Sequence, residues 1–143
     1  RLAAILTKSP RDIEMACADY GQALGTAFQV IDDVLDYDGE ALEMGKNLGD
    51  DLREGKVTLP LIIAMQRGNE DQRALIRNAV ETGSTESLHD VIAIVQATGA
   101  LTASREAAAA QAQLAIDAAS KLPANEHTDA LLELAAQLLS RRT

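Results

Sequence analysis

Proline and glycine divide this chain into segments of helical length, and that division limits the folds open to it. Ser9 and Pro10 together are typical of a helix start, where serine caps the helix and proline occupies its first turn. A long helix is expected to run from there to about Tyr37 and to stop at Asp38-Gly39. The opening residues RLAAILT are expected to be the tail of a helix, which indicates a chain cut from a longer one.

The same pattern continues after an acidic, glycine-containing connector over residues 39–56. Each later segment is expected to be a helix, and all but the last end at a glycine or a proline. These segments are 59–66, 70–82 after Asn69, 84 or 85 to 98, 101–122, and 126–142 after Asn125. No useful strand-like alternation is present, so we expect an all-α fold: an antiparallel helical bundle of about six helices, forming a single domain over residues 1–143.

Small apolar residues are expected to pack this bundle, because aromatic residues make up only 2% of the chain while 47% is hydrophobic. Alanine and leucine dominate, and both are strong helix formers. On the long helix, residues at helical spacing predict a stripe that faces the core. The stripe comprises Ile13, Cys17, Tyr20, Leu24, Ala27, Phe28, Ile31 and Leu35.

Acidic residues are concentrated in one window of the chain. The net charge is −9, and nine of the 22 acids lie between residues 32 and 54, where Lys46 and Arg53 are the only basic residues. A net-acidic chain without a basic stripe argues against nucleic acid as a partner. A hard cation is the first candidate to balance such a cluster.

Other features bear on the compartment. The chain has one cysteine, Cys17, so no disulfide can form within it, and a cytoplasmic location is expected. No apolar run approaches the roughly 20 residues needed for a transmembrane segment, and no signal peptide is visible. His89 and His127 have no partner at ligand spacing and are expected to be surface groups.

Helical geometry places the acids of the long helix together. With Phe28 at zero, one flank at about 20° to 140° collects four polar residues and two glycines. They are Gly21, Gly25, Gln29, Asp32, Asp33 and Asp36. The carboxylates therefore lie beside a strip without side chains, which leaves room for a bulky ligand.

These carboxylates predict a magnesium site. Asp32 and Asp36 are one turn apart, about 6 Å along the axis, and flexible side chains can close that gap. Without a cation, close carboxylates would repel each other by roughly 2–3 kcal/mol. The alternative is a solvated helix end, although acids there oppose the helix dipole. A calcium EF-hand fails, because its first and twelfth positions would be Val34 and Gly45.

Lysines follow the acids in a glycine-broken loop. Lys46 and Lys56 suit phosphate oxygens, although alone they could simply neutralise an acidic surface. The segments FQVIDDVLD and GKNLGDDLREGKVTLPLI resemble the second aspartate-rich motif and lysine loop of the trans-isoprenyl diphosphate synthases. GTAFQVIDDVLDY and the GKxTLPL ending are most similar to the long-chain members, some of whose products become quinone side chains. The resemblance runs from the first helix to the tail.

The resemblance implies the C-terminal half of an isoprenoid synthase fold with Mg²⁺ as cofactor. It implies Asp32 as a direct magnesium ligand, with Asp33 and Asp36 acting through metal-bound water or as further ligands. It places Gln29 at the reacting end of the allylic group. It also assigns diphosphate contacts to Lys46 and Lys56, and makes Asp51 the supporting acid of the lysine loop.

The implied reaction is head-to-tail prenyl transfer, in which an allylic diphosphate condenses with isopentenyl diphosphate in a homodimeric enzyme. The family's first aspartate-rich motif and its isopentenyl diphosphate site have no counterpart in these 143 residues, so this chain alone is expected to be inactive. One alternative is a non-catalytic subunit that binds metal and diphosphate, and another is a helical interaction module. A terpene cyclase is a further alternative, but its second motif normally mixes Asn, Ser or Thr with Glu, unlike DDVLD.

Overall fold

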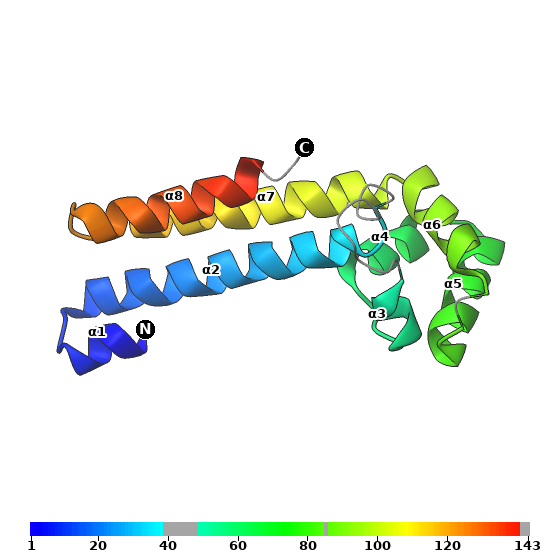
Figure 1. Ribbon diagram of the computed structural model, residues 1–143, viewed down its shortest axis with the longest axis horizontal. Coiled ribbons are helices and arrows are strands. Elements are labelled where there is room, and N and C mark those ends of the chain that lie inside the picture. Colours follow the sequence, from blue (N-terminus) through cyan, green and yellow to red (C-terminus); the bar gives the residue numbers. More distant parts are fainter. Residues whose placement is uncertain (39–48, 85, 141–143) are drawn as a thin grey trace. The chain divides into compact units, whose positions relative to one another are not determined.

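The computed structural model describes residues 1–38, 49–84 and 86–140, and these residues form helices and turns without a strand among them (Figure 1). The all-α fold is therefore confirmed. The helices are α1 Leu2–Leu6, α2 Arg11–Leu35, α3 Asp50–Arg53, α4 Leu59–Arg67, α5 Glu70–Thr82, α6 Leu88–Ala97, α7 Ala100–Ala119 and α8 Glu126–Ser140.

Most helix ends lie where local sequence predicted them. Asn69 and Gln72 form a reciprocal capping box at the start of α5, with both hydrogen bonds at 2.9 Å. Gly83 then ends α5 in the left-handed conformation, at φ 61°. At α8 the side-chain oxygen of Asn125 accepts hydrogen bonds from the backbone N–H groups of residues 127 and 128, both at 3.0 Å.

One short helix was missed and some predicted boundaries were wrong, among them the end of the 101–122 helix, because α7 stops at Ala119 and the chain turns there. The connector contains the short helix α3 at its end. The helix α6 begins at Leu88 rather than after Ser84, because the Ser84 hydroxyl accepts the N–H of Glu86 at 3.2 Å in a local turn. The helix α2 ends at Leu35, since the Tyr37 N–H bonds to the carbonyl of Val34 at 3.1 Å and tightens the last turn.

The described residues divide into two compact units: residues 1–29 with 107–140, and residues 30–38, 49–84 and 86–106 together. Helix α2 runs from the first unit into the second. The first unit packs α2 against α7 and α8 through small side chains, and the Tyr20 hydroxyl donates to the carbonyl of Leu131 at 2.9 Å. Its buried core is Tyr20, Ala23, Ala115, Ala118, Ala119 and Ala135.

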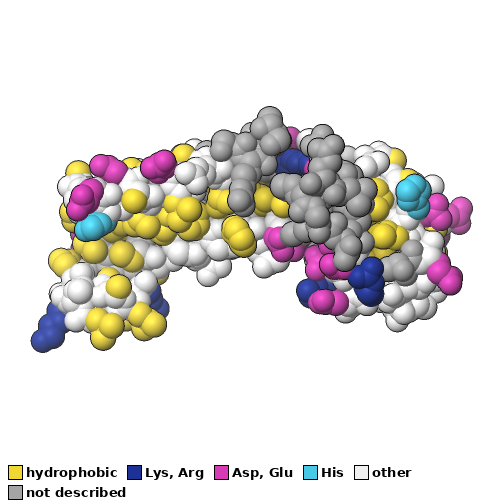
Figure 2. Space-filling view, viewed as in Figure 1, with side chains coloured by type: hydrophobic (Ala, Val, Ile, Leu, Met, Phe, Trp, Pro, Cys, Tyr) yellow, Lys and Arg dark blue, Asp and Glu magenta, His cyan; other side chains and the backbone are white. Residues whose placement is uncertain are grey.

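The predicted core stripe of α2 is rotated from the observed one. Tyr20 and Ala27 of the predicted stripe are buried, but Phe28 is 54% exposed, and Ala16 and Ala23, which the stripe left out, are buried. The neighbouring helices present alanines, so the narrow alanine face of α2 allows the closest packing and the larger ring is left outside. Figure 2 shows further apolar side chains gathered over α1, where Leu2 and Leu6 are strongly exposed.

The core of the second unit is formed by α4, α5 and α6, and each of these helices contacts the other two. Pro60 stands in the first turn of α4, where its missing N–H costs no hydrogen bond. Directly after α2, the side chain of Tyr37 enters this core and is fully buried. Other fully buried members are Leu52, Leu61, Ile76, Val91 and Val95.

Candidate functional site

Three carboxylates lie in the last turn of α2 and directly after it. Asp32 is half-buried, while Asp33 and Asp36 are 9% and 7% exposed. The N–H of Asp36 still bonds to the carbonyl of Asp32, at 3.3 Å, so these residues follow the helical path. Buried acids at a helix C-terminus are unfavourable both by desolvation and by the helix dipole. Acids in such a position are commonly stabilised by hydrogen-bond donors or by positive charge.

Asp36 joins the end of α2 to the start of α3. Its backbone carbonyl accepts the N–H of Gly49 at 3.1 Å, and its Oδ2 accepts the N–H of Asp51 at 3.2 Å. Asp36 thus accepts hydrogen bonds both from the residue before α3 and from the first turn of α3. One oxygen of this predicted ligand is already engaged within the chain.

The environment of Asp36 disfavours its charge. Burial, followed by the negative charge of Asp51, raises the pKa of Asp36 to about 6. Hydrogen bonds from the backbone N–H groups of Asp51 and Asp50 lower the pKa, but by less. Among the described residues, burial and the charge of Asp51 therefore disfavour the charged form of Asp36.

Lys56 forms ion pairs with Asp51 of α3 and with Glu54, the residue directly after α3. Its Nζ lies 2.6 Å from Glu54 Oε2 and 3.3 Å from Asp51 Oδ1, and the side chain is 56% exposed. The hydrogen bond to Glu54 and then that to Asp51 raise the pKa of Lys56, so it stays protonated. The structure therefore links Asp36, Asp51 and Lys56 in one chain of contacts.

The other predicted site residues have different outcomes. Lys46 lies outside the described residues. Gln29 is exposed and is the last residue of the first unit, whereas the carboxylates belong to the second. Gly21 and Gly25 are exposed as well, and a Cβ added at either glycine would meet nothing within 4 Å. The glycine flank of α2 is therefore open, as the helical phase predicted.

The fit of this group to a metal ion is partial. Within residues 1–38, 49–84 and 86–138, no three carboxylate, thiol or imidazole groups converge as a complete metal site. The donor chemistry nevertheless suits a hard cation, and magnesium is commonly held by one or two carboxylates while phosphate oxygens and water fill its remaining positions. Asp32 and Asp33 are the residues that could supply those carboxylates.

Sequence reasoning missed several residues beside this group. Arg105, from α7, forms an ion pair with Asp38. Their separation of 67 residues explains why no local pattern revealed the pair. The buried hydroxyl groups of Tyr37, Thr58 and Ser104 have no hydrogen-bond partner among the described residues.

Tyr37 is the largest of these buried hydroxyl-bearing side chains. Burial, and then the charge of Asp36, raise the pKa of Tyr37 far above its ordinary value, so the phenol stays neutral. The neighbouring Thr58 hydroxyl opposes this rise, although the two groups lack the geometry of a hydrogen bond. A neutral, buried phenol therefore directly follows the carboxylate of Asp36.

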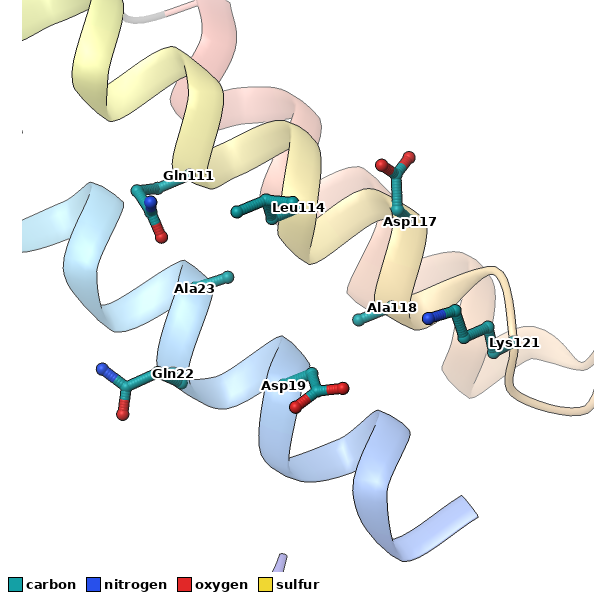
Figure 3. A pocket seen from close by; sticks show the side chains of 8 residues that line it. All are labelled: Asp19, Gln22, Ala23, Gln111, Leu114, Asp117, Ala118 and Lys121. Carbon is teal, nitrogen blue, oxygen red and sulfur yellow. The ribbon is translucent and has the colours of Figure 1, made fainter. Parts of the chain in front are cut away.

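A separate groove of about 390 Å³ lies between α2 and α7 within the first unit (Figure 3). Apolar atoms of Ala23, Leu114 and Ala118 line it, together with charged groups of both signs. Figure 3 shows the carboxylate of Asp117 turned away from α2. The sequence did not predict this groove.

In the described part of the chain, no helix has the length and apolar character needed to cross a membrane.

Known proteins resemble this chain in sequence. The sequence model of the family described as "Polyprenyl synthetase" matches residues 1–98. An octaprenyl diphosphate synthase of Haemophilus influenzae is 48% identical over 134 residues, which cover 93% of this chain and 41% of the relative. An all-trans-nonaprenyl-diphosphate synthase (geranyl-diphosphate specific) of Rhodobacter capsulatus is 46% identical and covers 97% of this chain and 42% of the relative. The chain thus spans about two fifths of the length of these curated relatives.

Solved structures agree with these matches. A decaprenyl diphosphate synthase from Rhodobacter capsulatus superposes with a TM-score of 0.88 at 38% identity, covering 99% of this chain and 44% of that protein. A polyprenyl synthase from Caulobacter crescentus, complexed with calcium and isoprenyl diphosphate, gives a TM-score of 0.77 at 41% identity. That match covers 90% of this chain and 40% of the solved protein.

Proposed function

Because this chain belongs to the polyprenyl synthetase family, we propose that it supplies the second aspartate-rich motif of a magnesium-dependent, all-trans polyprenyl diphosphate synthase. The complete synthase would condense an allylic diphosphate with isopentenyl diphosphate by head-to-tail prenyl transfer. The names of the similar proteins specify octaprenyl, nonaprenyl and decaprenyl products, which supports a long-chain product and a role in making quinone side chains.

The observation that carries this proposal is the group of carboxylates at the end of α2. Asp33 and Asp36 are buried acids, and Asp32 beside them is half-buried, so three carboxylates are gathered within five residues. A relative of this fold is bound to calcium and isoprenyl diphosphate, a divalent cation and a ligand of the proposed chemistry. We therefore assign Asp32 as the main magnesium ligand and Asp33 as a second. Asp36 would act through metal-bound water, since its Oδ2 already accepts the Asp51 N–H.

The basic and amide side chains would act on the substrate. Lys46 and Lys56 would contact the diphosphate oxygens, with Lys56 turning from its exposed pairing with Glu54 and Asp51. Gln29 would lie along the allylic group, one turn before the first carboxylate. The open flank at Gly21 and Gly25 leaves space next to the helix for an apolar chain.

The chemistry follows from where charge develops. The allylic carbon–oxygen bond breaks, and the leaving diphosphate gains negative charge that the two lysines stabilise. Bound magnesium supplies further positive charge to the same oxygens. The double bond of isopentenyl diphosphate then attacks the allylic cation and forms the new carbon–carbon bond. The released diphosphate accepts the proton that is lost as a double bond forms again.

An Asp32→Asn exchange in the complete synthase tests the metal assignment. We expect turnover to fall by orders of magnitude, about 10²-fold or more, because the loss of a ligand weakens charge stabilisation at the leaving group. Steady-state kinetics and circular dichroism would show lost activity with retained helix content. Asp19→Asn, an exposed aspartate on the same helix, is the matched control and should stay within about twofold.

Turnover of Asp32→Asn near that of the unchanged enzyme would contradict the metal assignment. The non-catalytic alternative has its own signature. If the complete protein binds a diphosphate analogue only with magnesium but forms no product from both substrates, it is a binding subunit instead of an enzyme.

A further inference from the structure

The ion pair between Arg105 and Asp38 connects parts of the second unit that are distant in sequence. Arg105 Nη2 donates to Asp38 Oδ2, and the two side chains are 31% and 16% exposed. Pairs on an open surface contribute little to stability, whereas a partly shielded pair is less screened by solvent and salt. Loss of one partner would leave the other charge partly buried.

The position of Asp38 gives this contact its importance. Asp38 stands three residues after the end of α2 at Leu35. Before it, Asp36 accepts backbone hydrogen bonds from Gly49 and Asp51, and Tyr37 is buried in the core. Asp36 is therefore held by backbone hydrogen bonds, Tyr37 by burial in the core, and Asp38 by the ion pair with Arg105.

Such restraint is needed because this helix end is intrinsically unfavourable. The last carbonyl groups of a helix lack intrahelical partners, so terminal turns tend to fray. Asp32 and Asp33 add negative charge at the negative end of the helix dipole. Arg105 places a cation at Asp38, three residues after the last residue of the helix.

We propose that Arg105 is a positioning residue, whose ion pair with Asp38 holds the end of α2 so that the carboxylates of Asp32 and Asp33 are ready to receive magnesium diphosphate. This inference rests on the proposed function. Arg105 acts through Asp38, and its contribution is the ordered helix end and not a contact with the metal. A purely structural ion pair would contribute to thermal stability without changing the affinity for magnesium diphosphate.

The test uses the complete synthase with inorganic pyrophosphate and magnesium as the probe. Arg105→Gln should raise the calorimetric Kd for magnesium pyrophosphate about tenfold, the usual effect of losing a residue that orients a metal ligand. Hydrogen exchange at the amides of residues 34–38 should accelerate, while amides of α5 keep their rates. Arg105→Lys should restore part of the affinity, because it keeps the charge but loses the planar geometry.

Two further variants and a control make the test specific. Asp38→Asn should reproduce the effect of Arg105→Gln, and the double variant should be no weaker than either single one, since both remove the same ion pair. Arg77→Gln removes an equal charge from an exposed position on α5 in the same unit and should leave the Kd unchanged.

Two results would overturn the inference. If Arg105→Gln and Asp38→Asn lower the melting temperature but leave the Kd within twofold, the ion pair is structural only. If the unchanged synthase binds no magnesium pyrophosphate, the proposed function itself fails and the inference fails with it. The first result leaves the proposed function intact, so the two failures can be distinguished.

Discussion

At the end of α2, Asp36 serves the fold at the cost of burying a charge. It accepts backbone hydrogen bonds from Gly49 and Asp51, yet it is 7% exposed and close to the negative charge of Asp51. Charges that strain the folded state are common at functional sites, where a ligand later compensates them. The two tyrosines also differ: the hydroxyl of the buried Tyr20 donates a hydrogen bond, whereas the Tyr37 hydroxyl has no hydrogen-bond partner among the described residues.

An Asp36→Asn exchange should stabilise the magnesium-free protein. The folded pKa of Asp36 is about 6, above the ordinary value of 3.8, so the carboxylate lowers stability progressively as pH rises between these values. Asparagine has no such charge and can still accept the Asp51 N–H. We expect a gain of about 1–2 kcal/mol at pH 7, allowing for solvent screening.

The measurement is thermal or urea unfolding of the complete protein in EDTA between pH 4 and pH 7. The advantage of Asp36→Asn should shrink as pH falls below 6, because the parent carboxyl group is then protonated. A variant that is less stable than the parent at pH 7 would show that the hydrogen bonds made by the charged carboxylate outweigh the cost of its burial.

Paired tyrosine exchanges should differ in their effect on stability. Tyr20→Phe removes the hydrogen bond to the Leu131 carbonyl and should cost about 1 kcal/mol in free energy of unfolding. Tyr37→Phe removes a buried hydroxyl group without a hydrogen-bond partner among the described residues, and should cost less or even stabilise the protein. Urea unfolding compares the two variants directly. An equal loss of unfolding free energy in both would indicate a bound water that hydrogen-bonds to the Tyr37 hydroxyl.

At the scale of the helix, α2 has two faces with different roles. Its alanine face packs in the first unit, whereas the flank of Gly21 and Gly25 is open. Glycine in a helix interior lowers helix stability by about 0.5–1 kcal/mol relative to alanine. Two glycines with free space above them therefore have no packing reason in this structure, and close approach of a ligand would explain them.

A Gly25→Ala exchange separates these effects. The added methyl group meets nothing within 4 Å, so the free energy of unfolding should rise by about 0.5–1 kcal/mol. If an apolar chain lies against this flank, the same variant should raise the KM for the allylic diphosphate. Unfolding and steady-state kinetics on the complete synthase would check both; higher stability with unchanged KM would place the substrate elsewhere.

At the scale of the whole chain, apolar surface is left uncovered. Leu2, Leu6 and Phe28 are each more than half exposed, and the chain spans about two fifths of the curated relatives. Patches of this kind commonly mark surfaces that bind other protein. The isolated chain is therefore expected to associate in solution and to differ in behaviour from a complete synthase.

The 143-residue chain alone should form no product from allylic and isopentenyl diphosphates, because the proposed site lacks the family's first aspartate-rich motif. Radiolabelled condensation assays would measure this, with the complete synthase as the positive control. The isolated chain should also bind a hydrophobic dye. Product formation by the chain alone would contradict the proposal that a further segment is essential.

Local sequence was sufficient to locate most of the helices and to single out the carboxylates of α2. Caps such as Asn69 and Asn125 act within a few residues, and helical periodicity places Asp32, Asp33 and Asp36 on one flank. The glycine flank was predictable for the same reason. These features depend on neighbours along the chain, which the sequence shows directly.

Contacts between distant residues required the folded chain. Arg105 meets Asp38 across 67 residues, Asp36 bonds to the start of α3, and Phe28 is exposed because alanines of α7 and α8 select another face of α2. Each outcome depends on which surfaces pack together, and packing is set by shape and burial across the whole fold. Local patterns carry no record of such partners, so only the three-dimensional arrangement could reveal them.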